Sequence, residues 1–376
     1  MSTTTTDTLT PIARPILGEL MTYVPGKPIE EVQRELGLDH VIKLASNENA
    51  LGPSPLAIEA MKAACATTRF YPEDTCYELI RELARYHDTP GEQIVIGRGS
   101  DEVIHYLGLA LLCPGDECVM ADPTFPMYPI TTTMMEAKSV CVPLRDFTHD
   151  LPAMADAVTA RTKIIFIANP HNPTGTIVRR DEVKALLDRV PERVVVVLDE
   201  AYFEYVDDTG YPDGLDYLRQ GRPNVVSLRT FSKIHALAGL RIGYGLFPSG
   251  LASAVRKVRA PFNVSTIAQV AATASLRDPE HVEVSRRHNR ESRRFLMDAF
   301  DAMGLSYAES HANFVFVDVR HDAKTVADML LRRGVIVRQS AGFKSPTHVR
   351  VSFGREAENE EFVEALGQVL KELGGQ

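Results

Sequence analysis

The stretch Arg193–Tyr202, which reads RVVVVLDEAY, indicates how this chain folds. Its five consecutive aliphatic residues do not alternate with polar ones, so a strand formed here would be buried on both faces. Short apolar runs of this kind recur from about residue 92 onward, with brief helical patterns such as Asp181–Arg189 between them. Strands that alternate with helices predict a mainly parallel sheet between helices. The runs are Gln93–Gly97, Glu117–Ala121, Ser139–Pro143, Lys163–Ala168, Arg193–Leu198, Val225–Leu228 and Ile242–Phe247.

The sequence pattern changes after about residue 262. A long charged helical pattern covers Pro279–Met303, and in His348–Phe353 apolar and polar residues alternate, which is typical of a half-exposed sheet. We therefore predict an α/β protein with a large domain over residues 46–262, built on a mainly parallel seven-stranded sheet, and a smaller α+β domain over residues 263–376. Residues 1–45, rich in Pro from residue 11 on, are expected to form a partly disordered N-terminal arm on the body of the protein.

Composition argues against several classes of function. The formal net charge is -9, which disfavours binding to nucleic acids or anionic membranes. The five cysteines form no CxxC pair, so neither a disulfide framework nor a zinc site is expected. The start, MSTTTTDTLTP, lacks the basic and apolar regions of a signal peptide, and no apolar run approaches the roughly 18 residues that span a bilayer. The prediction is a soluble protein of the reducing cytoplasm.

A second informative stretch is Thr230-Phe231-Ser232-Lys233, which follows an apolar run and is followed by Arg241 eight positions after the lysine. An amine in this setting can form an imine with an aldehyde, while two hydroxyls and a guanidinium can hold a phosphate. Pyridoxal 5'-phosphate is an aldehyde that carries a phosphate, so it fits this set. The alternative is a surface lysine, which is the usual place for this residue type.

Asp199 and Tyr202 follow the apolar run Arg193–Leu198. A carboxylate after five aliphatic residues lies at the buried edge of a sheet, where it needs a cationic or hydrogen-bonding partner. A protonated pyridine nitrogen is such a partner, and Tyr202 could reach the O3' oxygen of the same ring. Asp199 could instead be a metal ligand or a helix cap; metal is the weaker alternative because no His or acid cluster is near.

Two loops carry further candidates. Residues 169–175, NPHNPTG, contain two X-Pro steps and a glycine, which predicts a rigid loop at the carboxyl edge of the sheet, where Asn172 could donate its amide to a phenolate-type oxygen. Residues 97–102, GRGSDE, open a helix, so Ser100 and Asp101 could hold an anion at its N-terminus. Alternatively, both segments are ordinary turns, with Ser100 or Asp101 as a helix cap.

A second anion site could be built from Arg338 and Arg350, which lie in strands inferred for the smaller domain. Arginines on strands are usually solvated or paired, so these two indicate an anion site only in combination with the other candidates. Tyr23 and the segment Asn47-Glu48-Asn49 could close the pocket from the arm; the alternative for both is a docked turn.

Taken in this order, the segments resemble the fold-type I pyridoxal-phosphate-dependent aminotransferases along nearly the whole chain. Within that superfamily the likeness is strongest to the histidinol-phosphate aminotransferases. The marks of that family are YVPGKP (residues 23–28), KLASNEN (43–49), Tyr71-Pro72, GSDE (99–102), RTFSK (229–233), ALAGLR (236–241) and ANF (312–314).

The resemblance implies a role for each candidate. Lys233 would form the imine with the cofactor and move protons, and Asp199 would pair with the pyridinium nitrogen. Tyr71 would reach the cofactor of a neighbouring subunit, which implies a homodimer; the N-terminal arm would pack on the smaller domain or on this dimer partner. For the rest, Asn172 and Tyr202 would bind O3'; Ser100, Asp101, Thr230, Ser232 and Arg241 would hold the cofactor phosphate; Phe125 would stack on the ring; and Arg350 would bind the substrate carboxylate or phosphate, with Arg338, Tyr23 and Asn49 on the same substrate side.

Three positions depart from the usual pattern of the family. Phe125 stands where a tyrosine often stacks on the ring, Ala50 stands where proline is common, and His171 replaces a frequent asparagine. None of these changes touches Lys233 or Asp199, so we expect a competent catalyst.

The reaction implied by the resemblance converts L-histidinol phosphate and 2-oxoglutarate to imidazole acetol phosphate and glutamate, a step of histidine biosynthesis. An aromatic amino-acid aminotransferase would use the same residues with a more tolerant pocket. A threonine-phosphate decarboxylase that depends on pyridoxal phosphate shares the fold. A non-catalytic regulator that binds pyridoxal phosphate would need a DNA-binding module, for which the sequence offers no basic patch.

Overall fold

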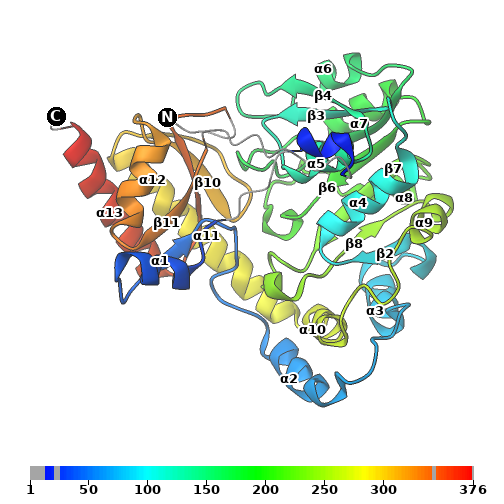
Figure 1. Cartoon of the computed structure of the whole chain (residues 1–376), viewed down its shortest axis with the longest axis horizontal. Coiled ribbons are helices and arrows are strands. Elements are labelled where there is room, and N and C mark those ends of the chain that lie inside the picture. Colours follow the sequence, from blue (N-terminus) through cyan, green and yellow to red (C-terminus); the bar gives the residue numbers. More distant parts are fainter. Residues whose placement is uncertain (1–12, 21–25, 341–343, 375–376) are drawn as a thin grey trace.

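The computed structural model describes residues 13–20, 26–340 and 344–374. Tyr23 and the start of the predicted N-terminal arm lie outside the described residues. Two sheets organise the chain: a seven-stranded sheet in the larger body and a five-stranded sheet in the smaller one, each packed against helices (Figure 1). Within the described residues, none of the helices combines the length and apolar character needed to cross a bilayer.

The seven-stranded sheet runs in the order β2-β8-β7-β6-β5-β3-β4. Its neighbouring strands are parallel except where β8 pairs with β2 and with β7. The strands are β2 Ile94–Gly97, β3 Glu117–Asp122, β4 Lys138–Pro143, β5 Thr162–Ala168, β6 Val195–Asp199, β7 Val225–Thr230 and β8 Gly243–Leu246. The predicted mainly parallel seven-stranded sheet is thereby confirmed.

Helices cover both faces of this sheet because successive residues of its central strands are all apolar. In β5, Ile164 and Phe166 pack with α4, α5 and α9 on one face, whereas Ile165 and Ile167 pack with α6 and α7 on the other. Every residue of β6 is buried, as its unbroken valines require. The covering helices are α4 Ser100–Leu111, α5 Met127–Met134, α6 Leu151–Asp156, α7 Arg180–Arg189, α8 Gly214–Arg219 and α9 Ser249–Arg256.

A further group of helices packs beside β2 and β8. Helix α10 (Thr266–Leu276) lies against α2 (Pro55–Ala64) and α3 (Tyr77–His87), and their apolar side chains share one cluster with those of β2 and β8. Helix α10 thus follows the proposed boundary at residue 262 in sequence but packs on helices that precede it. The domain boundaries stay a prediction.

The five-stranded sheet has the order β1-β11-β12-β10-β9, and its outer face is covered by α11, α12 and α13. Its first strand comes from the predicted arm and pairs in parallel with β11. The strands are β1 Ile42–Leu44, β9 Ser306–Ala308, β10 Phe314–Asp318, β11 Val335–Gln339 and β12 His348–Ser352. The helices are α1 Ile29–Leu36, α11 Pro279–Ala302, α12 Ala323–Leu331 and α13 Glu356–Gly374.

Strand β12 alternates as predicted, but its polar face is buried. Val349 and Val351 join the apolar core under the helices. Arg350 and Ser352, on the opposite face, are only 7% and 3% exposed, so the expectation of a half-exposed sheet is wrong here. The physical reason is that this face packs against the larger body, where Arg350 reaches Asn172.

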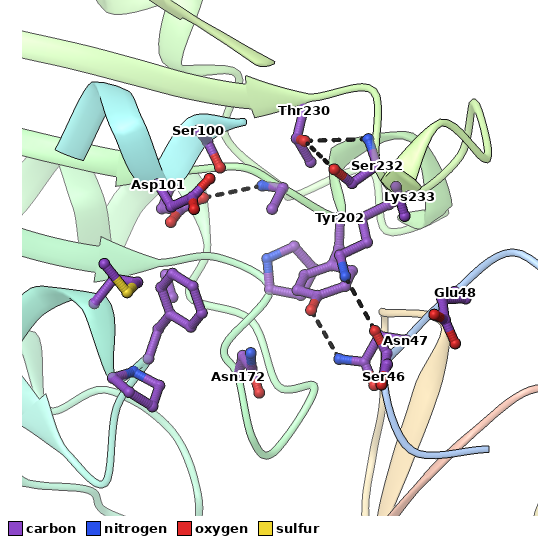
Figure 2. A pocket seen from close by; sticks show the side chains of 18 of the residues that line it. Ser46, Asn47, Glu48, Ser100, Asp101, Asn172, Tyr202, Thr230, Ser232 and Lys233 are labelled. Carbon is purple, nitrogen blue, oxygen red and sulfur yellow. Dashed lines mark hydrogen bonds between the residues drawn. The ribbon is translucent and has the colours of Figure 1, made fainter. Parts of the chain in front are cut away.

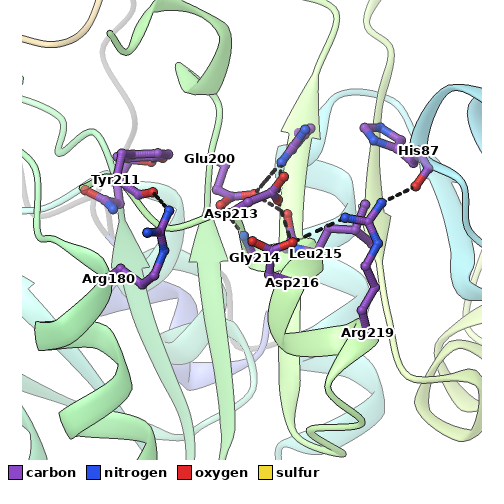
Figure 3. Close-up of polar contacts among 12 residues, drawn as sticks. His87, Arg180, Glu200, Tyr211, Asp213, Gly214, Leu215, Asp216 and Arg219 are labelled. Atoms are coloured by element: carbon purple, nitrogen blue, oxygen red, sulfur yellow. Dashed lines mark hydrogen bonds and ion pairs between the residues drawn. The ribbon is translucent and has the colours of Figure 1, made fainter. Parts of the chain in front are cut away.

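A buried ion pair ties the ends of β6 and β7 together. Arg229 donates from Nε and Nη2 to Glu200 Oε2, both at 3.2 Å, and from Nη2 to Asp213 Oδ1 at 2.7 Å. Glu200 also accepts the backbone N–H of Gly214 at 2.8 Å, and Figure 3 shows Glu200 and Asp213 beside Gly214 at the start of α8. The guanidinium lies 3.5 Å from the ring centroid of Phe203. These contacts fix the strand ends that precede the site described below.

Replacing Arg229 by methionine should lower the free energy of unfolding by roughly 3–5 kcal/mol, because Glu200 would remain buried without its cation. Urea denaturation at fixed protein and cofactor concentrations measures this change. Arg189→Met is the matched control, since it breaks an exposed pair with Asp156 and should have little effect. An Arg229→Met protein as stable as the control would contradict the assigned role of the pair.

Candidate active site

A pocket of about 400 Å³ opens at the carboxyl ends of β5, β6 and β7, where the five-stranded sheet faces the larger body. The carboxyl edge of a parallel sheet is where α/β proteins bind ligands, and the volume suits a small molecule. The wall combines distant parts of the chain: Ala45–Glu48, Ser100–Asp101, Phe125–Tyr128, Asn172, Asp199, Tyr202, Thr230, Ser232, Lys233, Arg241, Arg338 and Arg350.

Lys233 stands at the centre of the pocket (Figure 2). It follows the turn after β7, and its Nζ lies 3.4 Å from the carbonyl oxygen of Ser46. Burial, together with the positive charges of Arg350 and Arg241, lowers the pKa of Lys233 to about 8. The neutral amine, which is the nucleophilic form, is therefore accessible near neutral pH.

Asp199 ends β6 with its carboxylate buried at the floor of the pocket. The hydroxyl of Tyr128 donates to Oδ2 at 2.8 Å, and the backbone N–H of Ala201 donates to Oδ1 at 3.3 Å. Burial raises the pKa of Asp199 to about 6, against the lowering effect of the Tyr128 hydrogen bond. A buried carboxylate that accepts from two neutral donors is suited to a cationic ligand group such as a protonated ring nitrogen.

Contacts between the two bodies orient Asn172 and Tyr202. Arg350 Nη1 donates to Asn172 Oδ1 at 2.6 Å, so the amide nitrogen of Asn172 is turned away from the arginine. Asn47 Nδ2 donates to the hydroxyl oxygen of Tyr202 at 2.8 Å, and Asn47 adopts a positive φ of 56° to do so. Both side chains line the pocket, and their binding to O3' stays a prediction.

Donors converge at the N-terminus of α4. Gly99 has φ +85°, and a Cβ there would collide with Asp101 and Arg241, so the turn needs glycine. Arg241 Nη2 donates to Asp101 Oδ1 at 2.8 Å and Nη1 to Ser232 Oγ at 3.4 Å. The Thr230 hydroxyl donates to the same Ser232 oxygen at 3.0 Å. A helix N-terminus, two hydroxyls and a guanidinium form a suitable phosphate site.

The site fits pyridoxal 5'-phosphate on the chemistry of its side chains. One cavity brings together an amine for the aldehyde, a buried carboxylate for the ring nitrogen and a phosphate-binding turn. Phe125 also lines the cavity, with its ring edge-on to Tyr128 at 5.5 Å between centroids.

Two predicted site residues lie elsewhere in the structure. Asn49 is not among the residues that line the pocket; its amide donates to the carbonyl oxygen of Ile234 at 2.9 Å and to Ser285 Oγ at 3.0 Å. Tyr71 is 81% exposed and stacks on Phe262, with 4.9 Å between ring centroids, away from the pocket of its own chain.

Sequence reasoning missed Tyr128 as a partner of Asp199. The residue is fully buried and stacks on Phe166 in parallel, with 4.5 Å between ring centroids. Its neighbours in sequence are apolar, so the pattern indicates a core residue. The available signal was its position three residues after Phe125, on a segment already assigned to the ring.

Comparison with known proteins gives consistent matches. The sequence profile of the family described as Aminotransferase class I and II matches residues 39–366. The histidinol-phosphate aminotransferase of Moorella thermoacetica is 48% identical over 96% of this chain and 93% of its own. That of Caldicellulosiruptor saccharolyticus is 44% identical over 95% of this chain and 99% of its own. The crystal structure of histidinol-phosphate aminotransferase from Sinorhizobium meliloti in complex with pyridoxal-5'-phosphate has a TM-score of 0.89 at 28% identity, covering 97% of this chain and 99% of that one.

The chain therefore belongs to the class I and II aminotransferases. The two relatives named above both carry the name histidinol-phosphate aminotransferase, which confirms the likeness predicted from the motifs. The α/β fold class, the enzyme class and the pyridoxal-phosphate cofactor that the resemblance implied are confirmed with it.

Replacing Tyr128 by phenylalanine should raise the pKa of Asp199 further, because a hydrogen bond to its ionised form is lost. Cofactor affinity depends on the ionised carboxylate, so it should fall about 10-fold near neutral pH, and the acid limb of its pH dependence should move to higher pH. Fluorescence titration of the apoprotein with cofactor measures both effects.

Tyr244→Phe is the control for this experiment. Tyr244 is equally buried and its hydroxyl bonds His87 at 2.8 Å, outside the pocket. It should lose some stability without any shift in the acid limb. Identical pH profiles for both variants would remove Tyr128 from the site.

Proposed function

We propose that this aminotransferase transfers the amino group of L-histidinol phosphate to 2-oxoglutarate, giving imidazole acetol phosphate and glutamate in histidine biosynthesis. The observation that carries the proposal is the pair Arg338 and Arg350, which lie opposite each other in the register of β11 and β12 and both line the pocket. Two neighbouring guanidinium groups match a dianionic phosphate better than a single carboxylate. The names of the full-length relatives support the same donor.

Pyridoxal 5'-phosphate, when bound, supplies an aldehyde that takes up the amino group and a ring that accepts electrons. Asp199 would keep the ring nitrogen protonated, and Lys233 would face the aldehyde end. Of the other residues, Asn172 and Tyr202 would bind O3', Phe125 would stack on the ring, and Ser100, Asp101, Thr230, Ser232 and Arg241 would hold the phosphate. The amide direction of Asn172, set by Arg350, leaves its nitrogen as the donor that O3' needs.

Lys233 would move the proton in both half-reactions. Its amine takes the proton from the donor carbon that carries the amino group, and in the second half-reaction it returns a proton to the matching carbon of the keto acid. The lowered pKa of Lys233 supports this role, because a general base must be unprotonated when the substrate arrives. Arg350 would hold the anionic group of the substrate in each half-reaction.

Replacing Arg350 by alanine should raise the KM for both histidinol phosphate and 2-oxoglutarate by about 10- to 100-fold, because one cation serves both substrates. Arg338→Ala should raise the KM for histidinol phosphate more than that for 2-oxoglutarate. The reason is that the phosphate group carries two charges, whereas the carboxylate that takes its place carries one. Steady-state assays of glutamate formation measure both. Arg332→Ala, an exposed arginine of the same body, is the control and should leave both KM values unchanged.

The same assay separates the alternatives. The proposed enzyme forms glutamate and shows a higher kcat/KM for histidinol phosphate than for phenylalanine or tyrosine. An aromatic aminotransferase would reverse that order, and a decarboxylase would release carbon dioxide without forming glutamate.

We also infer a homodimer in which Tyr71 reaches the partner's cofactor. Phe70, Tyr71 and Phe262 are 60%, 81% and 45% exposed and lie next to one another in sequence or by ring stacking. Exposed aromatic groups of this kind are typical of protein interfaces. The position of Tyr71 outside its own pocket supports the same assignment.

Mixing two impaired variants tests the dimer. Tyr71→Ala keeps Lys233, and Lys233→Ala keeps Tyr71, so a hybrid dimer contains one site with both native residues. Subunit exchange should recover up to about one quarter of wild-type activity per subunit, because half of the dimers are hybrids with one native site each. Recovery no greater than the average of the two parents would contradict a shared site.

A reducing cytoplasm is part of the same proposal. All five cysteines are unpaired, and Cys76 and Cys118 are buried where no other cysteine bonds them. Chains that persist in oxidising compartments usually carry disulfides, which supports this placement.

A further inference from the structure

The backbone around Glu48 is held from both bodies. The N–H of Asn47 donates to Ser352 Oγ at 2.8 Å, and its side-chain amide donates to the Tyr202 hydroxyl at 2.8 Å. Asn313 Nδ2 donates to the carbonyl oxygens of Asn47 at 3.0 Å and of Glu48 at 3.4 Å. The Glu48 side chain therefore starts from a fixed point on the pocket wall.

The Glu48 carboxylate lies on the side of the pocket away from the phosphate-binding turn. Figure 2 shows Ser100 and Asp101 on one side of Lys233 and Glu48 on the other. The carboxylate contacts Lys43 Nζ at 2.9 Å, and 46% of the side chain is exposed. Two carboxylate oxygens offer several acceptor positions, so one contact with lysine leaves capacity for a ligand.

Glu48 differs from the other acids of the pocket. Among the described residues that line it, the carboxylates are Asp101, Asp199 and Glu48. Asp101 pairs with Arg241 at the phosphate end, and Asp199 lies on the floor with Tyr128. Glu48 is thus the acid that serves neither end of the cofactor site.

Building on the proposed function, we propose that Glu48 recognises the imidazole ring of the amino donor by accepting the hydrogen bond of a ring N–H. The donor carries three polar groups. Its phosphate matches Arg338 and Arg350, and its amino group must approach Lys233. The imidazole is the third group, and a carboxylate is the acceptor that suits both its neutral N–H and its protonated form.

This contact would give the pocket its preference between donors of similar size. A phenyl ring in place of imidazole carries no N–H, and it would cover the Glu48 carboxylate without bonding it. Sites that bond a polar substrate group reject analogues that lack it more strongly than apolar pockets reject a wrong shape. Binding of the second substrate should not depend on Glu48, because the distal carboxylate of 2-oxoglutarate gains no attraction from a neighbouring carboxylate.

The test compares histidinol phosphate with phenylalaninol phosphate, which keeps the phosphate and the amino group and replaces only the imidazole by phenyl. In the holoenzyme, Glu48→Ala should lower kcat/KM for histidinol phosphate by about 10- to 100-fold. It should change kcat/KM for phenylalaninol phosphate by no more than about twofold and should not raise the KM for 2-oxoglutarate.

Two further variants support the comparison. Glu48→Gln keeps the side-chain shape and a neutral acceptor, so it should fall between wild type and Glu48→Ala, and it replaces the alanine variant if that protein does not fold. Lys43→Ala removes the ion-pair partner and keeps the carboxylate, so the preference for histidinol phosphate should persist.

The outcomes separate this inference from the proposed function. Equal losses with both phosphate donors would assign Glu48 a structural role, and an unchanged kcat/KM for histidinol phosphate would leave it without a role; either result overturns the inference alone. A wild-type enzyme that is inactive with histidinol phosphate and active with phenylalanine overturns the proposed function and the inference together.

Discussion

The structure depends on how two adjacent buried acids, Asp199 and Glu200, are stabilised at the end of an aliphatic strand. Burial of a carboxylate is costly unless a cation or several donors accompany it. Glu200 has Arg229 from the neighbouring strand, which makes it a fixed part of the fold. Asp199 has the Tyr128 hydroxyl and one backbone N–H. The protein thus satisfies one acid internally and leaves the other to a cationic ring, which explains why a scaffold feature and a binding feature occupy consecutive residues.

The site belongs to neither body alone. Asn172 is oriented by Arg350, Tyr202 is bonded by Asn47, and the Lys233 amine lies against Ser46, so each contact joins the larger body to the five-stranded sheet or to the segment that follows β1. Any rotation of the smaller body would therefore disturb cofactor groups and substrate groups together. A single set of hydrogen bonds thus positions the cofactor-side residues and the substrate-side residues.

The sequence was sufficient to predict the sheet and most of the residues that gather around the pocket, because strand-end acids, X-Pro loops and the RTFSK lysine are recognisable from local chemistry. The sequence was insufficient where packing between distant segments determines the burial or the partner of a side chain. The alternation in β12 shows two faces, but only the docked larger body explains why Arg350 is buried. From the sequence Tyr128 is a core residue, and only the structure shows that its hydroxyl donates a hydrogen bond to Asp199. The sequence suggests Asn49 for the pocket, yet the asparagine that lines it is Asn47, which adopts a positive φ of 56° and bonds Tyr202.

The pairing of β1 with β11 has a consequence for biosynthesis. Residues Ile42–Leu44 pair with Val335–Val337, close to the other end of the chain. Domains fold as the ribosome releases them, and contacts between distant segments form last. The larger sheet can therefore assemble before β1 has a partner strand. An unpaired strand edge is prone to aggregation, and chaperones shield such edges. The pocket wall that carries Glu48 is therefore completed at the end of translation. A nascent chain that stalls earlier would contain Asp199 and Lys233 but would lack Arg338 and Arg350 on the substrate side.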